Sequence, residues 1–536
     1  MSYHFDNQGK RSQFKVDKTG SSNLEVNDEF YGKAQAIDPQ LKRQRIPILS
    51  ATYSHIGNQG SRKNVDVDRL PRLSRNDVLV LDLGRHCVGH FNCQLITTGS
   101  HPDAPAVINV RFCEMEKELF ASKDYEGWLP KGWIQEDAVR ILNFPWKKEF
   151  ERVACRYIKI SIIDTSQKYQ LVLKNPEFVS ESSAGELNVN NEFCTNDSQL
   201  KQIDELSLAT LHSCMQTVFE DGPKRDRRLW IGDFRIQALT DEVTFENFDI
   251  IKRCLYLFAS TANRRTGSLC ADIFSDGVEQ PDDLEMGDYT LLFVDVLANY
   301  FGETKDKETL MGLYETAKRA VQYGLNQIDP SGIPNSDLVQ TVFLDWLADA
   351  NVSKEAATLG IIIFALNRLI YLAEIVEDPQ IPELRQIQTK LTSLARDLYF
   401  DQQKGLFVSG KNSQINWPSQ IWLVRANVFT KKQNQQLLRR ALDKLPMTFF
   451  VSPYLYGELC LTLCENDLVD LAVRLIKAYW GKMIAAGAQT SWEVFSIQDA
   501  EYSPYGVNST LVHSYCHGWG CVPAYIFRKY LKPDGK

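Results

Sequence analysis

The spacing of hydrophobic residues changes once along this 536-residue chain, and that change constrains its architecture more than any other feature. Before about residue 180, apolar residues come in short runs that alternate with polar ones, as in 156–163. Beyond about residue 195 they recur every three to four residues over long segments, as in 354–375. Alternation indicates half-buried strands, and the longer period indicates amphipathic helices. The sequence therefore predicts a β domain followed by a larger helical domain.

Composition shifts divide the chain further. Residues 1–45 are polar and aperiodic, so we expect an extended arm, and 46–180 hold β-rich runs separated by turns, which predicts an antiparallel β-sandwich. Residues 181–194 are small, polar and glycine-containing, as in a linker. Residues 195–530 contain roughly a dozen helical segments without a repeated motif, which favours an (α/α)6 toroid over a tetratricopeptide-like solenoid.

Charge and cysteine usage restrict the partners. The 60 Lys and Arg residues against 68 Asp and Glu give a net charge of −8, which leaves no basic footprint for nucleic acid or an anionic membrane. We found no secretory leader and no uncharged apolar stretch long enough to span a bilayer, and so expect a cytoplasmic protein. The twelve cysteines lie mostly in apolar stretches without a CxxC pair, so we expect buried thiols, no metal and no cofactor. A small neutral ligand fits best, and a homodimer is left open.

The densest cluster of functional side chains is DGPKRDRRLWIGD, residues 221–233. Its proline and two glycines favour a shaped loop between helices, whose side chains could point into a cavity. The carboxylates could supply an acid and ligands for hydroxyl groups, an arginine could orient them, and the tryptophan could cover a sugar ring. An ordinary surface ion-pair loop is the alternative. The candidates are Asp221, Arg225, Asp226, Trp230 and Asp233.

This stretch resembles the hallmark motif of the glycoside hydrolase family 78 α-L-rhamnosidases, Asp-Cys-Pro-X-Arg-Glu followed by Trp-X-Gly-Asp. Gly222 stands in place of the common Cys, and Asp226 stands where the family usually has its general acid, a Glu. The resemblance thus implies that Asp226 protonates the glycosidic oxygen. The residues that match the motif are Asp221, Pro223, Arg225, Trp230, Gly232 and Asp233.

A second carboxylate is needed to activate water or to attack the sugar. We assign it to Glu493, which is far from Asp226 in sequence, as opposite walls of a pocket would be. The family's general base is likewise a Glu in a Trp-Glu pair, followed by His-X-Trp, which Trp492–Glu493 and His517–Trp519 match. The resemblance covers about residues 195–530 and implies an inverting reaction, a preceding β-sandwich and a compact, two-domain form.

Further candidates lie near predicted helix ends, where a toroid gathers its loops around one pocket. We expect Asp221, Arg225, Asp233 and His517 to bind sugar hydroxyls, and Trp230, Trp346, Trp492 and Trp519 to pack on the ring and its methyl group. The remaining binding candidates are Asp288, Tyr289 and Asp345, and the next candidates for the acid are Glu279 and Glu285.

With these features, the resemblance implies a hydrolase that removes terminal α-L-rhamnose from small rhamnosides such as disaccharides and aryl or flavonoid glycosides. Two alternatives stay open at this point. Another (α/α)6 carbohydrate hydrolase, of the glucuronyl hydrolase or glucoamylase-like kind, would share the toroid and the paired carboxylates. A non-catalytic sugar-binding protein would keep the aromatic residues without needing an acid and a base.

Overall fold

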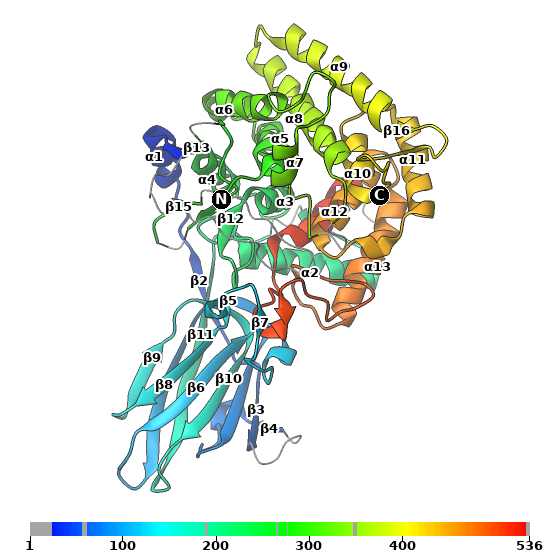
Figure 1. The fold of residues 1–536 in the computed structure, drawn as a ribbon. Helices are drawn as coiled ribbons and strands as arrows, with labels where there is room; N and C mark the ends of the chain where they lie inside the picture. Colours follow the sequence, from blue (N-terminus) through cyan, green and yellow to red (C-terminus); the bar gives the residue numbers. More distant parts are fainter. Residues whose placement is uncertain are drawn as a thin grey trace.

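The computed structural model has two lobes, one of strands and one of helices (Figure 1). It describes residues 24–55, 62–187, 191–263, 266–275, 277–282, 284–346 and 351–531. The strand lobe comes first in the chain, and the helical lobe follows to the C-terminus. The predicted order of a β domain and a helical domain is therefore confirmed.

The strand lobe is built on a sheet whose nine described strands all pair antiparallel. Its longest strand, β5, pairs through its first part with β3 and β10, and through its second part with β11 and β9. Alternate residues of these strands face one hydrophobic core, which includes Leu81, Phe91 and Ile158. The strands are β2 (Lys42–Ile46), β3 (Ser50–His55), β4 (Lys63–Val65), β5 (Asp77–Gly99), β6 (Ala106–Cys113), β8 (Glu136–Ile141), β9 (Trp146–Glu149), β10 (Val153–Asp164) and β11 (Tyr169–Ser182).

The N-terminal segment differs from the expected arm, in the part from residue 24 onward. Strand β1 (Leu24–Val26) pairs with β13 (Thr261–Asn263) of the helical lobe. Helix α1 (Asp28–Ala36) packs on α4, and the side chain of Asn27 caps it by accepting a hydrogen bond from Phe30 N. The helix is short and weakly amphipathic, so the polar residues around it hide its helical period in the sequence. Similarly, β11 runs to Ser182, inside the segment expected to be a linker.

The helical lobe is a closed ring of helix pairs. Among the described helices, α3, α5, α8, α10, α12 and α14 each contact the next, and α14 returns to α3. Helices α2, α4, α6, α9, α11 and α13 lie outside this ring, so the (α/α)6 toroid is confirmed. The bounds are α2 (Ser198–Cys214), α3 (Ile231–Asp241), α4 (Phe248–Ala259), α5 (Gly287–Thr304), α6 (Lys307–Leu325), α7 (Ser336–Thr341), α8 (Glu355–Val376), α9 (Ile381–Tyr399), α10 (Trp417–Arg425), α11 (Lys431–Lys444), α12 (Pro453–Glu465), α13 (Val469–Ala485) and α14 (Val522–Tyr530).

Burial separates the inner helices from the outer ones. Every residue of α3 and α10 is buried, whereas α9 and α11 bury only a stripe. Within the described residues, α8 alone is long and apolar enough to cross a membrane by length and composition. Two thirds of its apolar window is buried, and α8 packs against α5, α6, α9 and α10. Its hydropathy is accounted for by its place in the ring.

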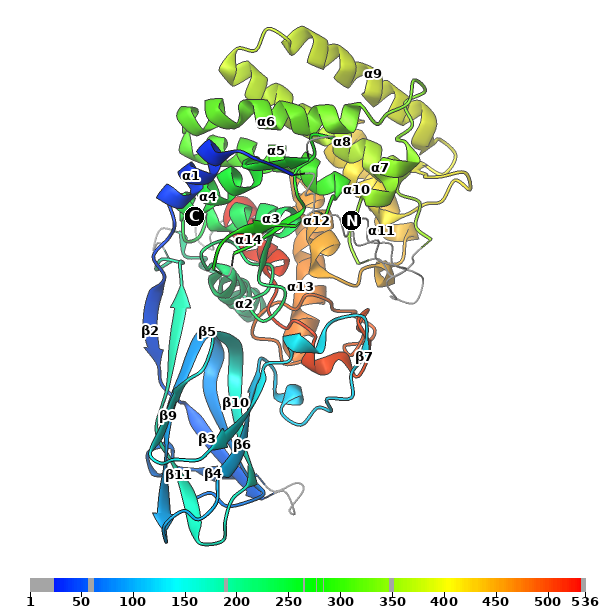
Figure 2. The same ribbon diagram turned by 60° about the vertical axis from the view of Figure 1, so that its left-hand side comes forward.

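The connection between β6 and β8 joins the two lobes in addition to the covalent link between them (Figure 2). The connection between β6 and β8 leaves the sheet and carries β7 (Glu126–Gly127), which pairs with β18 (Gly506–Val507) near the C-terminus. Tyr125 Oη donates a hydrogen bond to Tyr505 O at 2.7 Å across the same junction. The strand lobe therefore supplies a wall to the loops at one end of the toroid.

Candidate active site

The segment 221–233 runs from the connection between α2 and α3 into the first turn of α3, and Asp221 holds its loop in shape. The buried Asp221 carboxylate accepts hydrogen bonds from Asp226 N at 3.2 Å and Arg228 N at 3.0 Å, which ties both ends of the turn together. A Cβ atom on Gly222 would lie 2.3 Å from Arg225 O, so this backbone has no room for the cysteine that the motif commonly carries. The next residues form β12 (Arg228–Trp230), which pairs with β14 (Asp272–Phe274) and leads into α3.

This loop forms one side of a cavity of about 210 Å³ at the loop end of the toroid. The starts of α3 and α5, the segment after α7, the C-terminal loops and the β6–β8 connection supply the other sides. The lining residues are Trp128, Leu129, Pro130, Trp133, Asp221, Arg225, Asp226, Arg228, Trp230, Asp233, Leu284, Met286, Tyr289, Phe343, Trp346, Glu493, His517 and Trp519.

Arg225 bridges Asp226 and Glu493, the two carboxylates predicted to act as a pair. Its Nη1 lies 3.1 Å from Asp226 Oδ1, and its Nη2 donates to Glu493 Oε2. Val512 O accepts from Arg225 Nε at 2.9 Å, and the guanidinium lies over the Tyr505 ring. Burial would lower the pKa of Arg225, but the charges of Glu493, Tyr505 and Asp226 raise it. The arginine is therefore a cation that orients both carboxylates, and its terminal nitrogens are occupied by protein groups.

His517 lies at the deep end of the cavity among carboxylates. Its Nδ1 is 3.1 Å from Asp233 Oδ1, and its Nε2 is 3.7 Å from Asp221 Oδ2 and 4.0 Å from Glu493 Oε1. Burial alone would lower its pKa, but Asp233 and Asp221 together raise that pKa to about 10. Burial raises the pKa of Asp233 to about 6, although the charge of His517 opposes that rise. His517 is thus an imidazolium at neutral pH.

Two buried atoms in this group have hydrogen bonds still to make. Asp233 Oδ1 and His517 Nδ1 attract each other as charges, but their contact is not aligned as a hydrogen bond, and neither has another partner among the described residues. Buried polar atoms normally find a partner. A ligand hydroxyl in the cavity would satisfy both, since it can donate to the carboxylate and accept from the imidazolium.

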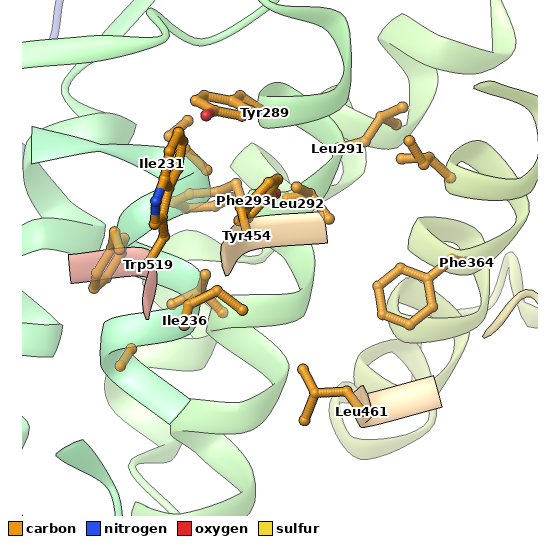
Figure 3. Close-up of a cluster of buried hydrophobic side chains, with 14 of the residues drawn as sticks. Ile231, Ile236, Tyr289, Leu291, Leu292, Phe293, Phe364, Tyr454, Leu461 and Trp519 are labelled. Carbon is orange, nitrogen blue, oxygen red and sulfur yellow. The ribbon is translucent and has the colours of Figure 1, made fainter. Parts of the chain in front are cut away.

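Aromatic rings form the apolar side of the cavity. Trp519 stacks on Tyr454 at 5.4 Å and on Phe343 at 6.4 Å between ring centroids, and Tyr289 meets Trp230 edge-on at 6.3 Å. Figure 3 shows Tyr289, Tyr454 and Trp519 gathered beside the α3 residues Ile231 and Ile236. A Cβ on Gly232 would lie 2.5 Å from the Tyr289 ring, so the motif glycine permits this close packing. Of these rings, Trp230, Tyr289, Phe343 and Trp519 line the cavity and give it an apolar aromatic surface.

The strand lobe anchors the motif loop through a buried ion cluster. Lys224 Nζ lies 2.6 Å from Glu118 Oε1 and 3.2 Å from Glu114 Oε2, and His86 Nε2 lies 3.1 Å from Glu114 Oε1. Burial would lower the pKa of Lys224, but these two glutamates raise it. Arg227 Nη2 also donates to Arg152 O at 2.9 Å. The loop that carries Asp226 is therefore held from the β domain.

Most of the predicted site residues come together here. The cavity is lined by Asp221, Arg225, Asp226, Trp230, Asp233, Tyr289, Trp346, Glu493, His517 and Trp519. Three candidates lie behind it. Asp288 accepts hydrogen bonds from Phe343 N and Leu344 N and so shapes the wall, while Asp345, whose pKa burial raises to about 7, accepts from Ser452 Oγ and Trp346 N. The Trp492 ring is buried against Phe495 and Tyr515.

The acidic stretch 275–290, which contains Glu279 and Glu285, supplies no carboxylate to the cavity among its described residues. Glu279 pairs with Arg253 and accepts from Tyr31 Oη, and Glu285 accepts from Thr266 Oγ1 at 2.8 Å and from Ser268 Oγ. Asp276 and Asp283 lie outside the described residues. Nor do the described residues contain a group of three His, Cys, Asp or Glu side chains placed to hold a metal ion.

Sequence reasoning missed the part of the wall that comes from the β domain. Trp128 and Trp133 lie in EGWLPKGW, where two tryptophans flank a Pro-Lys-Gly turn, a pattern that could have indicated a ligand-facing loop. Arg228, Leu284, Met286 and Phe343 were also missed, and single residues of these types carry no signal of their own.

Comparison with known families decides the identity of the chain. Residues 50–180 match the glycosyl hydrolase family 78 α-rhamnosidase N-terminal domain, and residues 189–531 match the bacterial α-L-rhamnosidase six-hairpin glycosidase domain. The chain belongs to glycoside hydrolase family 78. A search of curated proteins found no match.

Solved structures agree with this family 78 assignment. A rhamnosidase from Klebsiella oxytoca with rhamnose bound is 37% identical, with a TM-score of 0.88 over 95% of this chain and 99% of that one. The family 78 rhamnosidase of Bacillus sp. GL1 is 19% identical, with a TM-score of 0.69 over 85% of this chain and 46% of that one. The α-L-rhamnosidase of Streptomyces avermitilis is 16% identical, with a TM-score of 0.66 over 92% and 44%. The last two show the fold alone. This family 78 chain is an α-L-rhamnosidase, a glycoside hydrolase.

Proposed function

We propose that this rhamnosidase removes one terminal α-L-rhamnose from small rhamnosides by an inverting mechanism, with Asp226 as general acid and Glu493 as general base. The observation that carries the proposal is the bridge of Arg225 between these two carboxylates at one cavity. An inverting glycosidase needs one carboxylic acid for the leaving oxygen and one carboxylate for water on the opposite face of the sugar.

The environments of the two carboxyl groups suit these roles. Asp226 is the more open of the two, with 22% of its side chain exposed, so it can meet the glycosidic oxygen and recover a proton from solvent. Glu493 is only 5% exposed, and Glu493 N donates to Ser514 O, so its carboxylate is shielded from bulk solvent, which supports the role of a base that activates one water. Proton transfer from positioned groups of this kind typically contributes about 10² to 10⁴ in rate.

The size of the cavity supports a small substrate. Its 210 Å³ is below the roughly 300 to 1,000 Å³ usual for sites that enclose drug-sized ligands. One sugar ring therefore fills the deep end, where Asp233 and His517 face its hydroxyls. Disaccharides and aryl or flavonoid rhamnosides are the substrates that we propose.

Turnover of a panel of nitrophenyl glycosides tests this proposal. The α-L-rhamnoside should be hydrolysed, and the glucoside, glucuronide and arabinoside should not. NMR should show β-L-rhamnose as the anomer released first. Turnover of one of the other glycosides with none of the rhamnoside would remove the substrate assignment, and release of the α anomer would remove the water-activating role of Glu493.

A further inference from the structure

The mouth of the cavity is built from a segment of the β domain that the catalytic motifs do not include. Trp128, Leu129, Pro130 and Trp133 line the cavity, and all four belong to the β6–β8 connection. Leu284 and Met286 line it from the start of α5. The wall is thus apolar and aromatic, and it comes from both lobes.

This apolar wall lies on the side of the cavity that the aglycone of a bound rhamnoside would occupy. Of the cavity's four carboxyl groups, Asp226 is the most exposed, while Asp221, Asp233 and Glu493 have at most 5% of their side chains exposed. The cavity therefore has a closed polar end and an open end. A terminal sugar enters the closed end, and the group attached to it extends past the acid toward the opening, where Trp128, Trp133 and Trp230 are each half-buried.

The segment is held rigidly before any ligand arrives. Tyr125 Oη donates to Tyr505 O at 2.7 Å and accepts from Leu129 N at 3.0 Å, and Trp128 Nε1 donates to Pro504 O at 3.2 Å. The Trp128 ring packs against Trp346 at 5.9 Å and Tyr505 at 5.7 Å. A preorganised ring loses little conformational freedom on binding, which favours affinity.

Trp133 differs from the other tryptophans of the wall. It ends the short 3-10 helix Lys131–Trp133, lines the cavity and is half-buried, yet among the described residues no other ring stacks on it. One face of the indole is therefore available to a ligand. Leu129 and Pro130 add apolar surface to the lining, and the Trp128 N–H is already bonded to Pro504 O, so the lining side chains of this segment offer few groups for sugar hydroxyls.

Resting on the proposed function, we propose that Trp133, supported by Trp128 and Pro130, is the aglycone-binding site and selects planar aromatic aglycones. The deep end recognises the rhamnose, and the β-domain wall recognises what is attached to it. Specificity for the leaving group is thereby assigned to a different domain from the one that carries the proposed acid and base.

Kinetics with three substrates test this assignment. For Trp133→Ala, the KM for p-nitrophenyl α-L-rhamnoside should rise about tenfold, as expected for loss of one ring-on-ring contact with its buried area. The KM for methyl α-L-rhamnoside and the inhibition constant of free L-rhamnose should stay within about twofold. Trp133→Phe keeps a flat aromatic ring and should behave like the wild type. Trp133→Leu keeps an apolar side chain but has no flat aromatic face, so it should behave like Trp133→Ala.

The comparison of Phe with Leu keeps the test valid if the alanine variant does not fold. Phe120→Ala, an exposed ring on the same connection but outside the cavity, is the matched control and should change none of the constants. Equal losses on the aryl and methyl substrates, or no loss on either, would overturn the proposal. A rhamnosyl-glucose disaccharide that loses as much as the aryl substrate would overturn the aromatic preference. If the wild type cleaves no rhamnoside at all, the proposed function itself fails instead.

Discussion

The two sides of the active site are held by different parts of the molecule. Asp226 lies on a loop anchored to the β domain through Lys224 and Arg227, and it is partly open to solvent. Glu493 lies on a C-terminal loop held by the toroid, where Ser491 N donates to Thr210 Oγ1 and Trp519 Nε1 donates to Glu493 O. Arg225 is the point at which the two sides meet. The side of the proposed acid therefore depends on the domain interface, and the side of the proposed base depends on the ring of helices.

Substituting the two carboxyl groups should have the strongest consequences for activity, and the two variants should differ in how kcat/KM depends on the leaving group. Glu493→Gln should lower kcat/KM by about 10² to 10⁴ on every rhamnoside, because water must be activated whatever departs. Asp226→Asn should cause a loss of that size for an alkyl rhamnoside and little loss for a dinitrophenyl rhamnoside, whose leaving group needs no proton. The measurement is kcat/KM for both substrates with each variant.

Glu285→Gln is the matched control, because this carboxylate is bonded to Thr266 and Ser268 away from the cavity. It should leave kcat/KM within about twofold of the wild type. If Asp226→Asn lowers kcat/KM equally for the alkyl and the dinitrophenyl rhamnoside, the acid is another residue and the assignment of Asp226 is wrong.

The next effect concerns the anchor of the acid side. Lys224→Met leaves Glu114 and Glu118 buried without their cation, which should lower the free energy of unfolding by about 3 to 5 kcal/mol. Adding Glu118→Gln should restore part of that loss. Lys318→Met, which removes a partly exposed partner of Asp378, should cost at most about 1 kcal/mol.

Urea unfolding measures these differences in stability. The kinetics of the folded Lys224→Met variant then test whether the anchor also positions the acid. If the β domain positions the acid, Lys224→Met should lose more activity on the alkyl than on the dinitrophenyl rhamnoside. A loss of stability no larger than that of Lys318→Met would show that the cluster does not anchor the loop.

A further prediction concerns the pH dependence of the deep end. The folded pKa of His517 is raised to about 10 by Asp233 and Asp221, so its charge stabilises the fold fully below its unfolded pKa of about 6.5. That contribution is lost as the pH rises through about 10. The difference in unfolding free energy between the wild type and His517→Gln should therefore shrink from pH 6 to pH 10. The exposed His101→Gln should show no such trend, and a difference that grows with pH would contradict the assignment of an imidazolium.

The sequence predicted those parts of the molecule that leave a local pattern. Helical period and strand alternation marked the two lobes, and the motif spacing predicted that Asp221, Asp226 and Asp233 belong to one site. What no local pattern reveals is how distant segments face one another. Asp288 and Trp492 lie beside lining residues in sequence, yet one bonds the backbone of the wall and the other packs in the core.

The interface between the lobes was unpredictable for a related reason. A buried cluster of Glu114, Glu118 and Lys224 forms because β6 ends beside the motif loop. The periodic pattern of a sequence does not show that two such distant segments lie side by side. The Trp133 wall arises in the same way, from a connection that leaves the β domain to reach the C-terminal loops.

The cysteines have a practical consequence for labelling. All twelve lie within the described residues, and Cys194 alone is exposed, in the segment between β11 and α2. A maleimide dye needs access to the thiol, so it should attach to the native protein at this one position without any engineered cysteine. Cys194 lies beside Thr195, Asp470 and Leu531 of the helical domain, so the emission of a fluorophore placed there would report on the unfolding of that domain.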